Sequence, residues 1–288
     1  MLPLSILEDV KADVTQFAEK NDIGDFAKFI INKRYILDTP PTNFAAKSIV
    51  IAVWHQDVEH AVFTHKGRRA ASLVEGGHDR RNVGGNTALR QLFADKHVNE
   101  QYVHWMPMKR IAVRAGLCQY GRNNITYDSD WGSFVRIGAY VTDIEPPEEY
   151  FWQEAKIMNR CSTCGACVRK CPTKALCGDR FWVDGRLCLA NLNSGTDDIP
   201  KWVPKDAHRA LYGCYICQRV CPANASQLAN VKETVFDESE TEIMLKSRSY
   251  ADFPEEIRRK LWQFNIGTDF ECLPRNLELM LDSESNPK

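Results

Sequence analysis

The chain carries two cysteine motifs separated by a lone Cys188: Cys161-Ser-Thr-Cys164-Gly-Ala-Cys167-Val-Arg-Lys-Cys171-Pro172 and Cys214-Tyr-Ile-Cys217-Gln-Arg-Val-Cys221-Pro222. Three cysteines at three-residue intervals, then a fourth cysteine followed by proline, is the spacing with which bacterial two-cluster ferredoxins hold [4Fe–4S] cubes. In that arrangement the fourth cysteine of each motif ligates the other cluster. The two motifs therefore predict a double [4Fe–4S] domain.

The second motif lacks one cysteine, because Leu211 stands three residues before Cys214. Cys188 is the best candidate to replace it, and Cys177 is a competing candidate. With Cys188 as the displaced ligand, the rule that the fourth cysteine serves the other cluster gives two complete sets. The first set is Cys161, Cys164, Cys167 and Cys221, and the second is Cys171, Cys188, Cys214 and Cys217.

Zinc sites and disulfides are the two alternatives to iron–sulfur clusters for cysteines in such motifs. Zinc knuckles also use Cys-x-x-Cys pairs, but zinc requires neither a third cysteine at the same interval nor a proline after each terminal cysteine. A disulfide framework is typical of oxidising compartments. Eleven cysteines, eight of them in ordered spacings, favour metal ligation in a reducing compartment.

The bulk composition is that of an ordinary globular protein, with 288 residues and a formal net charge of -1. That charge gives no global attraction to nucleic acid or to an anionic membrane. The first residues contain neither a signal-peptide apolar region nor a twin-arginine start, and no window reaches the roughly 20 apolar residues that span a bilayer. We therefore expect a cytoplasmic protein with no membrane association.

Hydrophobic periodicity predicts a mixed α/β (α+β) N-terminal region. We expect helices over 4–20, 25–36, 87–97 and 107–115, strands over 47–54 and 101–106, and a hairpin over 124–142. After the cysteine motifs we expect helices over 253–262 and 273–281. The implied domains are 1–150 for cofactor or substrate, 151–228 for the two clusters, and a C-terminal helical segment over 229–288.

The segment from His65 to Asn86 has little periodicity and places basic residues, among them Arg68, Arg69, Arg80 and Arg81, beside glycines. Glycines let backbone and guanidinium groups approach a phosphate or a carboxylate. The segment matches neither a P-loop nor a dinucleotide fingerprint. A solvated surface loop, a ligand-binding loop and a tRNA-binding loop are the three interpretations.

In the order of its parts the chain resembles epoxyqueuosine reductases and, more distantly, reductive dehalogenases. The resemblance rests on the eight cysteines, on Pro107-Met-Lys-Arg-Ile-Ala-Val-Arg-Ala-Gly-Leu117 with Gly121-Arg-Asn123, and on Trp131-Gly-Ser-Phe-Val-Arg-Ile-Gly138. It covers about residues 44–225. Both families are cobalamin-dependent iron–sulfur enzymes, so the resemblance implies two [4Fe–4S] clusters, a cobalamin and an α/β domain like that of cobalamin-dependent reductases.

The resemblance also implies roles for particular residues. His104 stands where the family has its proposed proton donor, an aspartate, and histidine can donate a proton near neutral pH. Cys118-Gln119 replaces the family's Gly-Trp, and Arg122 replaces its lysine. Catalytic candidates are His104 and, because it follows the expected helix over 107–115, Cys118. Cofactor-binding candidates are Arg122, Asn123, Tyr127 and Trp131, together with Arg68 and Arg69 from the basic segment described above. Plain packing is the alternative for His104, Cys118 and the aromatic residues.

The sequence thus predicts a reductase that passes single electrons through two clusters to a corrinoid site acting on a small or tRNA-borne substrate. Its implied partner is an external electron donor such as a ferredoxin or flavodoxin. The alternative is an accessory electron-transfer protein that docks a partner enzyme and binds no corrinoid of its own.

Overall fold

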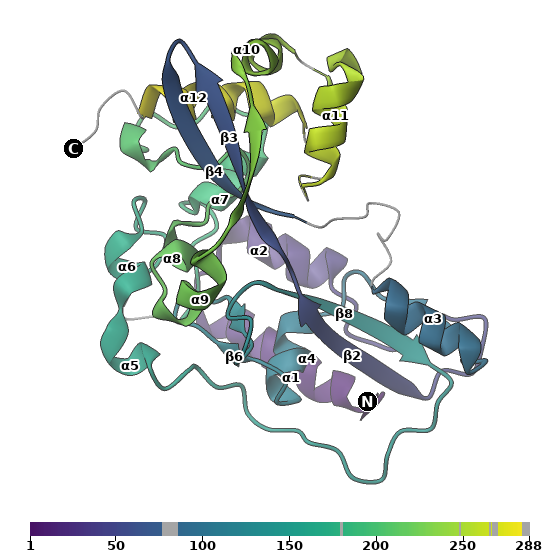
Figure 1. Cartoon of the computed structure of the whole chain (residues 1–288). Helices are drawn as coiled ribbons and strands as arrows, with labels where there is room; N and C mark the ends of the chain where they lie inside the picture. Colours follow the sequence, from purple (N-terminus) through teal and green to yellow (C-terminus); the bar gives the residue numbers. More distant parts are fainter. Residues whose placement is uncertain (77–85, 179–180, 248, 265, 267–269, 284–288) are drawn as a thin grey trace. The chain divides into compact units, whose positions relative to one another are not determined.

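The computed structural model describes residues 1–288 apart from 77–85, 179–180, 248, 265, 267–269 and 284–288 (Figure 1). The chain divides into two compact units. Unit 1 comprises Met1–His55 and Arg81–Thr163, and unit 2 comprises Gln56–Arg80 and Cys164–Lys288. Each unit therefore combines two separate stretches of chain. The expected domain boundaries at 150 and 228 do not coincide with the limits of these two units, and they stay a prediction.

Unit 1 contains a four-stranded antiparallel sheet in the order β1-β2-β8-β5. Its strands are β1 (Leu2–Pro3), β2 (Ser48–His55), β5 (Glu100–Tyr102) and β8 (Val135–Thr142), and a separate two-stranded ladder joins β6 (Gln119–Tyr120) to β7 (Thr126–Tyr127). β2 pairs with β8 along its full length. The strand expected over 47–54 is confirmed, because its β-branched apolar residues fit the interior position between β1 and β8.

The helices of unit 1 follow the apolar periodicity of the sequence. They are α1 (Ile6–Lys20), α2 (Gly24–Phe29) continued by a π-helical turn (Ile30–Arg34), α3 (Thr87–Asp95) and α4 (Met108–Arg114). α1 buries Ile6, Leu7 and Val10. α3 begins where the Asn86 side chain accepts a hydrogen bond of 2.9 Å from the Leu89 N–H, as an N-cap does. The four helices expected in this part of the chain are confirmed within a few residues at each end.

The hairpin expected over 124–142 is wrong. β8 pairs with β2 on one side and with β5 on the other, and only an isolated bridge between Asp128 and Gly132 closes within the segment. Alternation of apolar residues identifies a strand but not its partner. The partner here lies about ninety residues away in sequence, at Ser48↔Thr142.

Unit 2 contains a three-stranded sheet in the order β4-β3-β9. β3 (Val58–His65) is antiparallel to β4 (Arg68–Glu75) and parallel to β9 (Lys232–Phe236). The turn between β3 and β4 is formed by Lys66 and Gly67, whose φ angles are both positive, 50° and 72°. A two-residue hairpin turn of this kind matches the twist of the strands.

The expectation of an irregular loop beginning at His65 is therefore wrong over Arg68–Glu75, which is regular strand. The sequence of β4 shows no alternation because its buried residues, Ala70, Ser72, Leu73 and Val74, do not fall on every second position. Arg80, Arg81 and the glycines at 77–85 lie outside the described residues.

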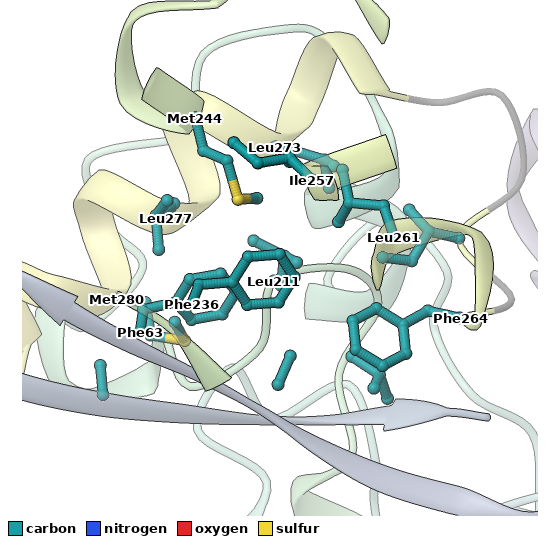
Figure 2. Packing of buried hydrophobic residues seen from close by; sticks show 14 of the residues in the cluster. Phe63, Leu211, Phe236, Met244, Ile257, Leu261, Phe264, Leu273, Leu277 and Met280 are labelled. Atoms are coloured by element: carbon teal, nitrogen blue, oxygen red, sulfur yellow. The ribbon is translucent and has the colours of Figure 1, made fainter. Parts of the chain in front are cut away.

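The main apolar core of unit 2 lies between this sheet and the C-terminal helices (Figure 2). The helices are α10 (Glu238–Lys246), α11 (Glu255–Trp262) and α12 (Leu273–Ser283). The rings of Phe63 and Phe236 stack, with centroids 4.9 Å apart. Figure 2 shows both near side chains of all three helices. α10 begins with a capping box in which Asp237 and Glu240 each accept a backbone N–H of the other. The helices expected over 253–262 and 273–281 are confirmed.

The cysteine region is made of short helices joined by turns. They are α5 (Cys161–Cys164), α6 (Ala166–Lys170), α7 (Leu189–Ser194), α8 (Ile216–Arg219) and α9 (Ala225–Leu228), with 3₁₀ turns at Lys205–Ala207 and Pro222–Asn224. Two further 3₁₀ turns, Tyr250–Asp252 and Phe270–Cys272, lie among the C-terminal helices. The mixture of helices and strands expected from the sequence is thus confirmed. Among the described helices, none has the length and apolar character needed to cross a membrane.

Candidate iron–sulfur site and the residues of unit 1

The first cysteine motif folds into two short helices separated by one left-handed residue. Gly165, between α5 and α6, has φ +59°, a conformation that costs other L-residues about 1–2 kcal/mol. The guanidinium of Arg169 donates a hydrogen bond of 2.8 Å to the Cys164 carbonyl across this turn. The boundary between the two units falls inside α5, directly before Cys164. The left-handed turn at Gly165 thus separates Cys164, at the end of α5, from Cys167 in α6.

Cys171, Cys188, Cys214 and Cys217 are brought together within unit 2. Burial is the main cause that raises the pKa of Cys214 to about 11, and the neighbouring Cys188 and Cys171 raise it further. Burial also raises the pKa of Cys188, again with a contribution from Cys171. Cys217 and Cys188 pack against an apolar group that contains Cys171, Ala175 and Leu176. These four residues form the second ligand set derived from the sequence.

Backbone N–H groups point at two of these sulfurs. The N–H groups of Ala190 and Asn191, at the start of α7, donate to Cys188 and lower its pKa, and the N–H of Ile216 does the same for Cys214. Peptide N–H groups aimed at sulfur, within an apolar shell, stabilise the anionic form in which cysteine binds iron. The surroundings therefore suit thiolate ligands of an iron–sulfur cluster.

Cys177, the competing ligand, has a different environment. Its thiol donates to the Lys174 carbonyl at 3.7 Å. Among the described residues it does not belong to the apolar group that holds Cys171, Cys188 and Cys217. The geometry favours Cys188 as the displaced ligand.

Leu211, which occupies the position of the missing cysteine, belongs to the main core of unit 2. Its side chain is fully buried in the cluster that also contains Phe63 and Phe236. Its N–H donates a hydrogen bond of 2.8 Å to Ser72 Oγ, and its carbonyl accepts one of 3.0 Å from Asn276 Nδ2. Position 211 thus serves the packing of the sheet on the helices.

All eleven cysteines lie in the described part of the chain, and none of them forms a disulfide there. Within the described residues, no group of three or more His, Cys, Asp or Glu side chains is set to hold a single metal ion.

In unit 1, His104 is exposed and lies in a turn after β5. Its ring meets the Trp105 ring edge-on at a centroid distance of 5.3 Å and lies 6.2 Å from that of Tyr102. Trp105 is 39% exposed, and the Arg34 guanidinium lies 5.6 Å from its ring centroid. The imidazole is thus accessible, as a proton donor requires, and its catalytic role stays a prediction.

Cys118 is buried, with 4% of its surface exposed. Burial, with a smaller contribution from Asp128, raises its pKa to about 12. A thiol that remains protonated at neutral pH is a poor nucleophile. The geometry favours the packing interpretation of Cys118 over the catalytic one.

The segment from Arg122 to Trp131 forms a compact turn in unit 1. The Arg122 Nε donates a hydrogen bond of 3.3 Å to the Cys161 carbonyl. Asn123 and Tyr127 are both buried, and Asn123 Nδ2 donates to the Tyr127 hydroxyl at 2.9 Å. Trp131 packs on His55, with ring centroids 5.9 Å apart. Asn123 and Tyr127 thus support the turn, and their contact with a cofactor stays a prediction.

Arg68 and Arg69 belong to unit 2 rather than to the unit that holds the other cofactor candidates. The Arg69 guanidinium forms an ion pair of 2.7 Å with the carboxylate of Glu233, which lies on β9 of the same sheet. The backbone N–H of Lys66 also donates to the Glu238 carboxylate. Acidic residues therefore accompany the basic tip of the β3–β4 hairpin, and no sequence signal local to the hairpin could have identified them.

Comparison with known proteins agrees with these features. Residues 160–224 match the family of 4Fe-4S double cluster binding domains. Epoxyqueuosine reductase of Listeria monocytogenes is 32% identical over 114 residues, which are 40% of this chain and 28% of that protein. The enzyme of Cellulophaga algicola is 24% identical over 217 residues, covering 71% of this chain and 68% of that protein. The chain resembles the epoxyqueuosine reductases.

Solved epoxyqueuosine reductases share the fold. The Bacillus subtilis structure, in which the loop with the catalytic aspartate is swung out of the active site, has a TM-score of 0.57 at 20% identity, covering 83% of this chain and 65% of that one. A structure with an epoxyqueuosine-modified tRNA stem loop has a TM-score of 0.58 at 18% identity, covering 83% and 65%. The alignments span less than a third of the Listeria monocytogenes relative and under two thirds of these solved chains.

The resemblance to epoxyqueuosine reductases expected from the cysteine spacing is therefore confirmed, as is the double [4Fe–4S] domain. The more distant resemblance to cobalamin-dependent reductive dehalogenases stays a prediction.

Proposed function

We propose that the chain is an iron–sulfur reductase that acts on a modified nucleoside of tRNA, as epoxyqueuosine reductases do. The convergence of Cys171, Cys188 and Cys214 in unit 2 is the observation that carries the proposal. Cys188 and Cys171 both contribute to raising the pKa of Cys214, which supports Cys188 as a ligand of the same cluster. The matching double-cluster family and the tRNA stem loop bound by a structural relative support the cofactor and the substrate class.

Two [4Fe–4S] clusters fit the residues present. Cys171, Cys188, Cys214 and Cys217 would hold one cluster, and Cys161, Cys164, Cys167 and Cys221 the other. When bound, the clusters would supply one electron at a time. The chain's own contribution is to exclude water with Ala175 and Leu176, which are buried, and to aim peptide N–H groups at the sulfurs.

In unit 1, His104 is the group able to deliver a proton. Its exposed imidazole lies next to Trp105, and both side chains can reach a nucleoside at the surface. A ring N–H would donate to the oxygen that leaves when a carbon–oxygen bond is reduced. Aromatic faces such as that of Trp105 stack on bases. His104 would thus act as the acid, a role that an aspartate of the catalytic loop would have in the Bacillus subtilis relative.

A corrinoid in unit 1 is the further part of the proposal, and it rests on the resemblance alone. Asn123 and Tyr127, expected beside the corrin, hydrogen-bond to each other in the interior. Arg122 and Trp131 are half-buried. His104 and Cys118, where this chain differs from the family pattern, flank the helix expected beside the corrin.

Anaerobic purification followed by iron, cobalt and tRNA assays tests the proposal. The expected result is iron for two cubes and reduction of an epoxide-bearing tRNA anticodon stem loop with a chemical reductant. Iron with no turnover, whether or not cobalamin is added, would contradict the reductase. Spectral titration with cobalamin tests the corrinoid separately, since an unchanged spectrum would remove that part alone.

The replacement of the catalytic aspartate by His104 favours one second candidate, an electron-transfer protein without a substrate of its own. It predicts that His104→Ala leaves cluster reduction and every measurable turnover unchanged. The reductase proposal predicts lost turnover with intact clusters.

A further inference from the structure

Unit 2 has a small surface hollow next to a cluster ligand. Cys214 lines it together with Leu189, Ile216, Tyr215 and the two arginines Arg209 and Arg219. Cys214 is half-buried, whereas Arg209 and Arg219 are exposed. The hollow thus joins the edge of the second ligand set to the protein surface.

The charges at this hollow are positive. Arg209 directs its Nε to a backbone oxygen, that of Asp206, at 3.0 Å rather than to a carboxylate. Burial lowers the pKa of the His60 imidazole, and the positive charge of Arg219 lowers it further. Two guanidinium groups therefore frame the approach to Cys214.

The net charge of the surrounding sequence is also positive. Residues 160–224 contain ten Lys and Arg against five Asp and Glu, whereas the whole chain has 37 against 38. The cluster-binding region is thus the basic part of a nearly neutral chain. A local patch of this kind attracts a partner of opposite charge and speeds its association.

We propose that an acidic one-electron carrier protein docks over this hollow and delivers electrons to the cluster held by Cys171, Cys188, Cys214 and Cys217. The inference rests on the proposed function, because it requires the clusters to be present. Electron transfer falls off steeply with distance, so the surface beside a ligand sulfur is the favourable entry point. Weak redox encounters use interfaces under about 1,200 Å², which a small basic patch can supply.

Flavodoxin is a suitable carrier because it is acidic and its colour reports its redox state. Its anionic hydroquinone would lose one electron to [4Fe–4S]²⁺, giving the blue neutral semiquinone and [4Fe–4S]⁺. The flavin keeps the proton on its ring nitrogen, so no proton moves in this step. Tyr215, beside Cys214 in the hollow, offers an aromatic contact for the carrier.

The test compares the holoprotein with the charge-reversed variant Arg209→Glu/Arg219→Glu. The rate constant for semiquinone formation should fall about tenfold or more at low salt, and the difference should shrink as salt screens the charges. Arg259→Glu is the control, because this exposed arginine lies on α11, which Figure 1 shows apart from α8 in the same unit. Its rate should match that of the wild type.

Reduction by dithionite separates this inference from the proposed function. If dithionite reduces the variants as fast as the wild type, the variants retain their clusters. If the wild type itself shows no cluster signal, the proposed function is overturned. An unchanged flavodoxin rate in the double variant, or no reduction of the wild type by flavodoxin, would overturn the docking site. Loss of tRNA affinity with an unchanged flavodoxin rate would reassign the patch to RNA.

Discussion

The backbone N–H of Leu211 donates a 2.8 Å hydrogen bond to Ser72 Oγ, which anchors the loop before Cys214 to strand β4. Ser72 is itself fully buried. The position that would carry a ligand in a complete second motif is thereby part of the core of unit 2, which supports the proposal that Cys188 is the ligand instead.

Moving the cysteine back to position 211 is therefore expected to fail. The variant Cys188→Ala/Leu211→Cys should bind no more iron than Cys188→Ala, because the side chain at 211 points into the core. Leu211→Ala alone should lower the free energy of unfolding by roughly 2–5 kcal/mol. Iron analysis and denaturant titration measure the two effects. Restored iron in the double variant would contradict this account of the displacement.

Cys188→Ala should cost the protein about half of its iron, because one cluster loses a ligand while the other keeps all four. Cys177→Ala is the matched control and should retain its iron, since that thiol bonds to the Lys174 carbonyl outside the apolar group. Iron and sulfide analysis after anaerobic reconstitution decides between them. The reverse pattern would make Cys177 the ligand.

Gly165→Ala should destabilise the first motif by about 1–2 kcal/mol, because φ +59° is unfavourable for a residue with a Cβ. The added carbon would also lie 3.0 Å from the Arg169 guanidinium. Gly185→Ala is the control, since a Cβ there meets nothing within 4 Å. Denaturant titration of both proteins under anaerobic conditions should separate them, and equal stabilities would count against a strained turn.

Arg122→Ala should lower the free energy of unfolding by about 1 kcal/mol, the typical net contribution of a hydrogen bond. Among the interactions lost is the hydrogen bond from Arg122 Nε to the Cys161 carbonyl. We expect faster loss of iron in air than for Arg160→Ala, a change at an exposed arginine just before Cys161. Identical decay of the visible iron–sulfur absorbance in the two variants would rule out this role.

The burial of Cys118 predicts a loss of stability at high pH. The thiol titrates near 9 in the unfolded chain but at about 12 in the folded protein. Its stabilising contribution is therefore complete below pH of about 9 and is lost as the pH rises toward about 12, because the unfolded state releases the proton first. Urea titration of the wild type and Cys118→Ala should show a shallower decline in the variant. Parallel curves would indicate an accessible thiol.

The cysteine spacing alone determined the double-cluster domain, because three-residue intervals and the terminal prolines encode local backbone turns around a cube. Apolar periodicity likewise located most of the helices and the strand over Ser48–His55, whose patterns depend on near neighbours. The sequence also predicted a set of eight ligands, with Cys188 in place of the cysteine missing at Leu211, and that set stays a prediction.

Only the tertiary structure decided which distant segments meet. It brought Cys188 beside Cys171 and Cys214, paired β8 with β2 and β5 instead of a local hairpin, and set Glu233 against Arg69. It also buried Asn123, Tyr127 and Cys118 while leaving His104 exposed. The physical reason is that periodicity and spacing report on neighbours along the chain, whereas strand partners, ion pairs and burial arise from packing between segments far apart in sequence.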